Sequence, residues 1–390
     1  MNFSIVTLGR AKLFPRERQA VSCLFFINGF VVGSLAPKIP ELGERLGISE
    51  SVLGFLILCF GLGSLTMMPF IGPIIARIGS ARPAKIAAAL LAPTILWLTL
   101  SPNIALAGIS LFLLGGFAGA MDIAMNANAV SVEQKTRRAV MSSCHGFWSL
   151  GGFVGAAGGG MLIEGAGNAT HAAIVTVTAA AGCALAWRKV LEDRPAGNRE
   201  RKPIRLPRTP LPYLVGLMAL VSMVPEGAVL DWGALYLRQT FAVDVAASGL
   251  AFGAFSAAMA LTRFAGDTIR NRFGATATLR ASAMLAFAGI FTASIAPQAG
   301  LAVAGFAIAG IGIANMAPIL FSAAGNLPGM APGIGLSVVT FMGYSGLLIA
   351  PATIGFIAER TGFGVIYAVL AVLVVTVAIF SGQARHADMR

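Results

Sequence analysis

Long apolar runs, separated by short polar stretches, make up most of the chain. Most of them reach about the ~20 residues that a helix needs to cross the ~30 Å hydrocarbon core of a bilayer. Backbone groups in lipid must be hydrogen-bonded within the protein, and the runs do not alternate as barrel strands do, so they predict helices. We expect twelve transmembrane helices, near residues 18–39, 51–75, 83–101, 104–130, 139–163, 170–187, 211–237, 247–265, 276–296, 301–323, 333–357 and 363–382.

The composition supports a membrane-embedded, all-α fold. Hydrophobic residues make up 57% of the chain, charged residues 11%, and the mean hydropathy is +0.81. A soluble domain averages about 45–50% apolar and about 25% charged residues. A chain of 390 residues with so few charges could not cover its surface in water. Lipid is therefore the expected solvent for most of it.

The basic residues are distributed unevenly between the two ends of the predicted helices. All but four of the 28 lysines and arginines fall in the N-terminus, the connections after the second, fourth, sixth and eighth runs, and the C-terminal tail. The exceptions are Lys38, Arg45, Arg238 and Arg360. This asymmetry predicts cytoplasmic termini in a bacterial inner membrane. The net charge of +12 then serves orientation and contact with anionic lipid, not nucleic-acid binding.

No residue pattern indicates an enzyme, a metal site or a cofactor site. The four cysteines, Cys23, Cys59, Cys144 and Cys183, lie inside apolar runs without a CxxC spacing, which is typical of small apolar residues. No phosphate loop, HExxH motif or nucleophile–base set is present. We expect a monomer whose partners are a small-molecule substrate, protons and the lipid bilayer.

The chain divides near its middle into two halves that repeat each other. The polar stretch from Arg188 to Pro212 separates six runs from six more. Residues 72–82 read GPIIARIGSAR and residues 266–274 read GDTIRNRFG, so Arg77-x-Gly79 and Arg272-x-Gly274 match at an offset of 195. Parallel six-helix repeats are one architecture of secondary transporters. The expected parts are an N-terminal half (1–187), a basic cytoplasmic linker (188–210) and a C-terminal half (211–390).

These loops resemble the Gly-x-x-x-Asp-Arg-x-Gly-Arg motif of the major facilitator superfamily. The resemblance implies that fold and a gating role for the loop residues, although Ala76 stands where the family has an Asp. The implied gating residues are Arg77, Gly79, Asp267, Arg270 and Arg272. A glycine stripe every four residues at Gly151, Gly155 and Gly159 predicts close helix packing.

Three carboxylates, Asp122, Glu226 and Asp231, lie inside apolar runs. An acid at mid-bilayer costs about 2.5–3.5 kcal/mol on insertion scales, so each is a functional candidate. Asp122 and Asn126 are four residues apart and share a helix face that should not meet lipid. The alternative is a buried polar pair that fixes helix packing.

Glu226 is flanked by Pro225 and Gly227, which predicts a broken helix carrying an acid at mid-membrane. Asp231 is nearer the outer surface and shares a face with Arg238. For Asp231, substrate contact and a gate or structural ion pair stay open as alternatives.

The fourth and fifth runs also resemble the fucose–proton symporter branch of the superfamily. The likeness rests on Asp122, then Asn126 four residues later, and on SSCHGFWSLG at residues 142–151. It implies that Asp122 is the protonatable acid, that Asn126 and His145 contact a sugar-type solute, and that Asn28 is the polar residue of the first helix. His145 fits a proton relay or a packed hydrogen-bonding group equally well.

We therefore expect a secondary active transporter that couples protons to a small polar solute, a sugar or related metabolite, by alternating access. The proton-coupling candidates are Asp122, Glu226 and His145. The substrate-binding candidates are Asn28, Asn126, Asn128, Trp148, Asp231, Trp232, Tyr236, Asn315 and Tyr344. The aromatic residues could instead anchor helices. The alternatives are a multidrug or metabolite efflux transporter of the same fold and a membrane receptor that transports nothing.

Overall fold

The computed structural model describes residues 15–193, 207–243 and 245–388, and these form helices throughout. Arg10, Lys12 and linker residues 194–206 lie outside the described residues. The elements are α1 (Arg16–Gly33), α2 (Lys38–Leu46), α3 (Glu50–Ile78), α4 (Ala81–Leu91), α5 (Thr94–Thr99), α6 (Ile104–Thr136), α7 (Met141–Ala166), α8 (Asn168–Trp187), α9 (Leu211–Phe241), α10 (Val245–Ser248), α11 (Leu250–Phe273), α12 (Ala275–Ser294), α13 (Ala299–Ile313), α14 (Met316–Gly325), α15 (Pro332–Thr361), α16 (Phe363–Ile379) and the 3₁₀ helix η1 (Ser381–Ala387).

Every predicted apolar run contains a helix or a helix with a short break. Ten helical segments in the described part are long and apolar enough to cross a membrane, and α16 with η1 makes an eleventh if that bent pair is one span. The predicted eighth span is α11, which has 24 residues but is less apolar because it carries Arg263, Asp267, Arg270 and Arg272. The all-α membrane class is confirmed.

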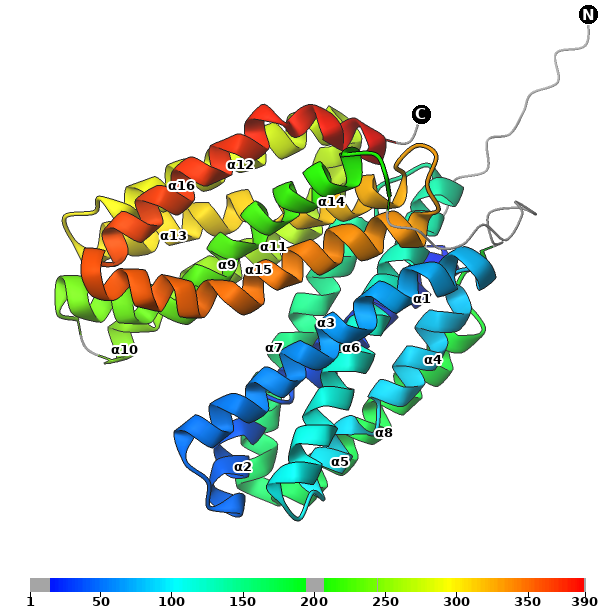
Figure 1. The fold of residues 1–390 in the computed structure, drawn as a ribbon, viewed down its shortest axis with the longest axis horizontal. Helices are drawn as coiled ribbons and strands as arrows, with labels where there is room; N and C mark the ends of the chain where they lie inside the picture. The colour runs from blue at the N-terminus through cyan, green and yellow to red at the C-terminus, as the bar shows by residue number, and fades with distance from the viewer. Residues whose placement is uncertain (1–14, 194–206, 244, 389–390) are drawn as a thin grey trace, which may run out of the picture.

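The helices form two groups, which we call the N-half (α1–α8) and the C-half (α9–α16 with η1). The groups converge on the side of the molecule where η1 lies and diverge toward α2 and α10 (Figure 1). We call the side with η1 and the start of α1 the closed end. The main contacts between the groups join α3 to α15 and α7 to α11.

The backbone of the two halves repeats at the predicted spacing of 195 residues. Gly79 ends α3 at φ 81° and Gly274 ends α11 at φ 80°. Gly167 and Gly362 stand between α7 and α8 and between α15 and α16, at φ 83° and 78°. Positive φ favours glycine because it has no Cβ. The same residue type thus makes the same turn in both halves.

An aspartate caps the third transmembrane helix of each half. The Asp193 carboxylate accepts hydrogen bonds from the backbone amides of Ser80 (2.9 Å) and Ala81 (3.2 Å) at the start of α4. Asp388 accepts one from the Ala275 amide at the start of α12 (2.7 Å). The two aspartates are again 195 residues apart. An acidic acceptor satisfies the free N–H groups of a helix N-terminus and complements the helix dipole.

The close helix packing that the glycine stripe predicts is confirmed between α1 and α7. A Cβ at Gly151 would lie 2.2 Å from the Phe26 carbonyl oxygen, and one at Gly155 would lie 2.3 Å from the Phe30 carbonyl oxygen. Any larger residue would push the two backbones apart. The stripe therefore holds α1 against α7, whose first turns carry part of the site described below.

We predict that Asp193→Ala and Asp388→Ala each lower the free energy of unfolding by about 1 kcal/mol, the usual effect of losing a helix cap. Chemical unfolding in detergent measures this. Asp193→Asn and Asp388→Asn keep an acceptor oxygen and should retain most of the stability. Alanine variants as stable as the wild type would contradict the capping role.

Candidate functional site: a polar cluster between the two halves

A hydrogen-bonded group of three side chains lies in the middle of the N-half. The Asn126 amide nitrogen donates to the backbone oxygen of Asp122 (2.8 Å) and to its Oδ1 (3.3 Å). His145 Nε2 lies 3.2 Å from Asn126 Oδ1. All three side chains are buried. The spacing of four residues on α6 therefore puts Asp122 and Asn126 on one face, as predicted, and that face meets α7.

The Asp122 carboxylate is incompletely satisfied. Its Oδ2 atom has no hydrogen-bond partner among the described residues, and no described ion pair includes it. The hydroxyl of Tyr344, on α15 of the C-half, lies beside this carboxylate. Asp122 is thus a buried acid at the boundary between the halves, next to a hydroxyl that belongs to the other half.

The C-half contributes a partly buried ion pair to the same boundary. Arg263 of α11 lies 3.4 Å from Glu226 Oε1 of α9. The guanidinium also donates to Ser149 Oγ of α7 (2.6 Å) and to the Ala314 carbonyl oxygen (3.4 Å). Arg263 therefore connects α9, the α13–α14 break and the N-half through one planar group.

Arg263 was not among the predicted site residues, although the sequence held a signal for it. It lies within the predicted run 247–265, where a cation needs a partner as much as an acid does. Because Arg263 was grouped with the basic residues of the following loop, its need for a partner inside the membrane was not recognised. Ser149 gave no such signal, because serine is common in helices and its partner is distant in sequence.

The predicted break in the helix around Glu226 is wrong. Helix α9 is continuous from Leu211 to Phe241 with Pro225 inside it. The break occurs instead between α13 and α14, at Ala314 and Asn315. The carbonyl oxygen of Ala314, at this break, accepts from Arg263, so the break also serves the ion pair.

Asn28 joins the N-half cluster through tryptophan. Its amide nitrogen donates to the Ala118 carbonyl oxygen (3.1 Å), and the Trp148 indole donates to its Oδ1 (2.9 Å). Trp148 is one turn along α7 from His145. Asn28, Trp148, Asn126 and His145 consequently line up where α1, α6 and α7 meet.

Three of the substrate-binding candidates lie inside a half and away from this cluster. Asn128 donates to Ser80 Oγ and the Leu191 carbonyl oxygen, both 2.9 Å, within the N-half. The Tyr236 hydroxyl donates to the Ala293 carbonyl oxygen, and its ring packs in the C-half core. Trp232 packs on Phe363. These side chains fasten helices of one half to each other.

Asp231 and Asn315 also differ from expectation. Asp231 is exposed, and no ion pair with Arg238 is present among the described residues. Asn315 is buried at the start of α14, and its Oδ1 has no partner among the described residues. A Cβ on Gly266 would lie 1.9 Å from that oxygen, so Asn315 packs against α11 rather than joining the cluster around Asp122.

The closed end is held by two carboxylates that cross between the halves. Asp267 of α11 accepts hydrogen bonds from the amides of Ser142 (2.9 Å) and Ser143 (3.2 Å), at the first turn of α7. Arg18 of α1 lies 3.4 Å from the same carboxylate. Asn271 accepts from the Ala139 amide (2.9 Å). The predicted gating residue Asp267 is therefore a helix cap that reaches across the boundary.

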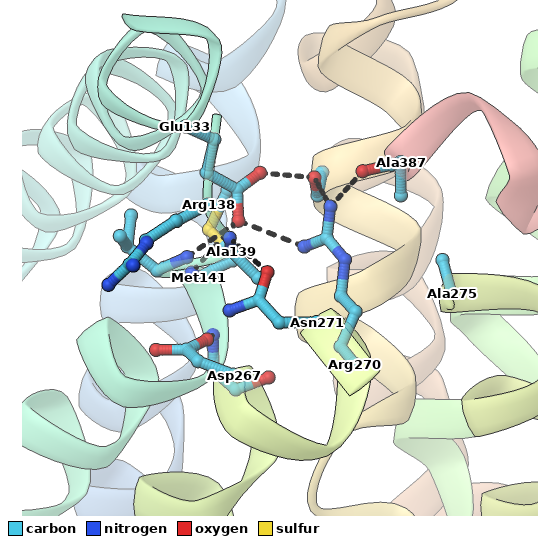
Figure 2. A network of polar contacts seen from close by, with 12 residues as sticks. Glu133, Arg138, Ala139, Met141, Asp267, Arg270, Asn271, Ala275 and Ala387 are labelled. Carbon is cyan, nitrogen blue, oxygen red and sulfur yellow. Dashed lines mark hydrogen bonds and ion pairs between the residues drawn. The ribbon is translucent and has the colours of Figure 1, made fainter. Parts of the chain in front are cut away.

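Glu133 is the second carboxylate and was missed from the sequence. It is fully buried and accepts from the amides of Val140 (2.9 Å) and Met141 (3.1 Å), from Arg270 (2.9 Å) and from Ser322. Arg270 also donates to the carbonyl oxygen of Ala387 in η1 (Figure 2). We call Glu133, Asp267, Arg270 and the amides of residues 139–143 the latch.

The corresponding loop of the N-half closes without charge. Arg77 and Arg272 are exposed, Arg272 lies over the Phe273 ring, and neither belongs to the latch. At the position equivalent to Asp267 stands Gly72, where a Cβ would lie 2.5 Å from the Gly333 carbonyl oxygen of α15. One side of the closed end is thus charged and the other is packed backbone against backbone.

Comparison with known proteins identifies the family. Residues 21–351 match the model of the Major Facilitator Superfamily. The chain belongs to the major facilitator superfamily. It is 34% identical over 366 residues to an uncharacterised MFS-type transporter of Yersinia pestis. The aligned residues cover 93% of this chain and 95% of that protein. It is accordingly a multi-pass transporter and not an enzyme.

Solved superfamily structures share the fold at low sequence identity. The fucose:proton symporter structure FucP in the outward conformation superposes with a TM-score of 0.81 at 16% identity, over 93% of this chain and 98% of that one. The human organic anion transporter MFSD10 gives 0.76 at 15% identity, over 94% and 99%. This major facilitator protein therefore resembles transporters with different substrates, and the fold alone does not select one.

We predict that Glu133→Gln loosens the latch. The variant leaves Arg270 buried without its carboxylate, and breaking a buried ion pair costs about 3–5 kcal/mol. Hydrogen exchange at the amides of Ser142 and Ser143, which Asp267 holds and the substitution does not touch, should become at least about tenfold faster. Exchange mass spectrometry measures it.

The amides of residues 275–280 provide the internal control, since Asp388 caps that segment within the C-half. Their exchange should stay unchanged. Equal acceleration in both segments would mean general destabilisation, and no acceleration at Ser142 and Ser143 would mean that Glu133 does not hold the halves together.

Proposed function

We propose that this major facilitator protein is a proton-coupled secondary transporter that moves a small polar solute, a sugar or related metabolite, by alternating access. The observation that carries the proposal is the polar cluster at the boundary of the halves. Asp122, Asn126 and His145 from one half lie next to Tyr344, Glu226 and Arg263 from the other. A transporter's substrate site is expected at this interface and depth.

Asp122 is the proposed proton carrier. A charged carboxylate buried away from water is costly unless a cation or several donors compensate it. Asp122 has no cationic partner in the described residues, and only one of its carboxylate oxygens accepts a hydrogen bond. The neutral acid suits this closed environment, and exposure to water on either side would allow the proton to leave.

Glu226 is proposed to act after Asp122, because Arg263 compensates its charge. Arg263 also donates to Ser149 of the opposite half, so separation of the halves at this depth would free donors of the guanidinium. His145 has one ring nitrogen on Asn126 and packs against Phe25 and Phe321. Asn126 thus lies between His145 and Asp122, and we propose His145 as a third proton-coupling group beside them.

The solute is proposed to bind through Asn28, Asn126, Trp148 and Tyr344. Amides and hydroxyls pair with sugar hydroxyls, and a half-buried indole offers a flat surface to a sugar ring. The likeness of Asp122 and Asn126 to the fucose–proton symporter branch supports a sugar. Buried charged and amide side chains at this boundary favour a polar solute over the apolar compounds of a multidrug exporter.

The closed end is proposed to face the cytoplasm of a bacterial cell. The basic connections lie on that side, which the positive-inside rule assigns to the cytoplasm. The latch then keeps the polar cluster from cytoplasmic water, and the described state corresponds to an outward-facing transporter. The overall likeness to FucP in its outward conformation supports this assignment.

The test is uptake of labelled monosaccharides and sugar derivatives into proteoliposomes under an imposed pH gradient. Asp122→Asn keeps the size of the side chain but cannot release a proton. We predict that this variant loses gradient-driven accumulation, falling to the level of protein-free liposomes, while exchange of solute across the membrane continues.

Glu164→Gln removes an exposed carboxylate of α7 and is the matched control, with accumulation expected at the wild-type level. Full driven accumulation by both Asp122→Asn and Glu226→Gln would refute the proton-carrier assignment. Transport of apolar drugs without any sugar uptake would favour the efflux alternative.

A further inference from the structure

A cavity on the outside of the N-half is not part of the transport site. It has a volume of about 590 Å³, within the usual range of about 300–1,000 Å³ for ligand pockets. Four alanines form part of its wall: Ala89 of α4, Ala92 directly after α4, and Ala180 and Ala184 of α8. Alanines here leave a groove between helices whose outer faces meet lipid.

The groove has the depth of one leaflet. The lining residues of α8 extend over seven residues from Ala180 to Trp187, and on the other side the lining residue Ala92 lies eleven residues beyond Ala81, where α4 begins. At 1.5 Å per residue these are about 10 and 16 Å. Half of a ~30 Å hydrocarbon core is about 15 Å. An acyl chain entering from the closed end would run along the groove for much of its length.

Cations stand at the mouth of the groove. Arg188 and Lys189 line it and are exposed, and neither has a carboxylate partner among the described residues. The two acids that follow are already engaged, because Glu192 pairs with Lys85 and Asp193 caps α4. The positive charge at the mouth is therefore available to an anion.

Trp187 indicates the depth in the membrane at which the mouth of the groove lies. Its ring lines the groove next to the two cations, and the Lys85 ammonium lies 5.8 Å from the ring centroid. Tryptophan is enriched at the level of lipid headgroups. The apolar groove thus lies at acyl-chain depth, and Arg188 and Lys189 lie at headgroup depth.

We propose that this groove is a binding site for one anionic phospholipid of the leaflet at the closed end. One acyl chain lies between α4 and α8, and the headgroup phosphate pairs with Arg188 and Lys189. Basic pockets between transmembrane helices on the cytoplasmic side are suited to anionic headgroups. The occupied groove would brace α4 against α8 at the point where Asp193 also ties them.

The test uses purified, delipidated protein in detergent, titrated with phosphatidylglycerol or with phosphatidylcholine of the same chains, and follows the thermal unfolding temperature. Phosphatidylglycerol should raise it in a saturable way and phosphatidylcholine much less. In Arg188→Gln/Lys189→Gln the apparent affinity for phosphatidylglycerol should fall at least about tenfold. Inorganic phosphate at equal concentration should give no shift, because the acyl chain is required.

Two further variants make the result specific. Ala184→Leu fills the groove from an exposed position and should weaken the lipid effect without changing the charge. Arg272→Gln removes an exposed cation from the closed end of the C-half and should leave it unchanged. Equal shifts with both lipids, equal loss in Arg272→Gln, or full affinity in both groove variants would each overturn the proposal.

Discussion

Every charge within lipid must find its partner inside the protein, because hydrocarbon offers none. In the described residues this requirement accounts for the polar contacts between α6, α7 and α11 that join the two halves. Glu133 is fully buried and is surrounded by two backbone amides, a guanidinium and a hydroxyl. Arg263 contacts Glu226 of α9, the Ala314 carbonyl at the α13–α14 break, and Ser149 of the other half. Since Glu133 and Arg270 belong to opposite halves, this ion pair is made only while the closed end stays closed.

The same requirement explains why two similar halves meet asymmetrically. The repeat supplies the same turn glycines and the same aspartate caps, Asp193 and Asp388, at equivalent positions. One difference between the halves is that Gly72 in the N-half corresponds to Asp267 in the C-half. Gly72 allows backbone contact with α15, whereas Asp267 brings a charge that needs amides and Arg18. One side of the closed end therefore depends on shape and the other on electrostatics.

The sequence predicted those site residues whose partners are close along a helix. Asp122 and Asn126 are four residues apart, and helix geometry alone places them together. Glu133, Ser149 and Arg263 could not be found that way, because their side-chain partners are 37 to 189 residues distant. Asn128, Trp232 and Tyr236 show the opposite error. A polar or aromatic residue in an apolar helix looks the same in sequence whether it faces the other half or a neighbour in its own half.

The sequence by itself determined the lipid environment of the helices, the class of fold, the repeat and its turns. Each of these follows from hydropathy, helix length or the backbone freedom of glycine over short distances. The tertiary structure decided which buried charges meet. A charged side chain in hydrocarbon requires a partner, but this requirement does not specify which one. The partner depends on the relative position of helices from opposite halves. Asp122 has no cationic partner among the described residues, whereas Glu226 pairs with Arg263. That difference, invisible in the apolar runs that contain both acids, separates the first proposed proton carrier from the second.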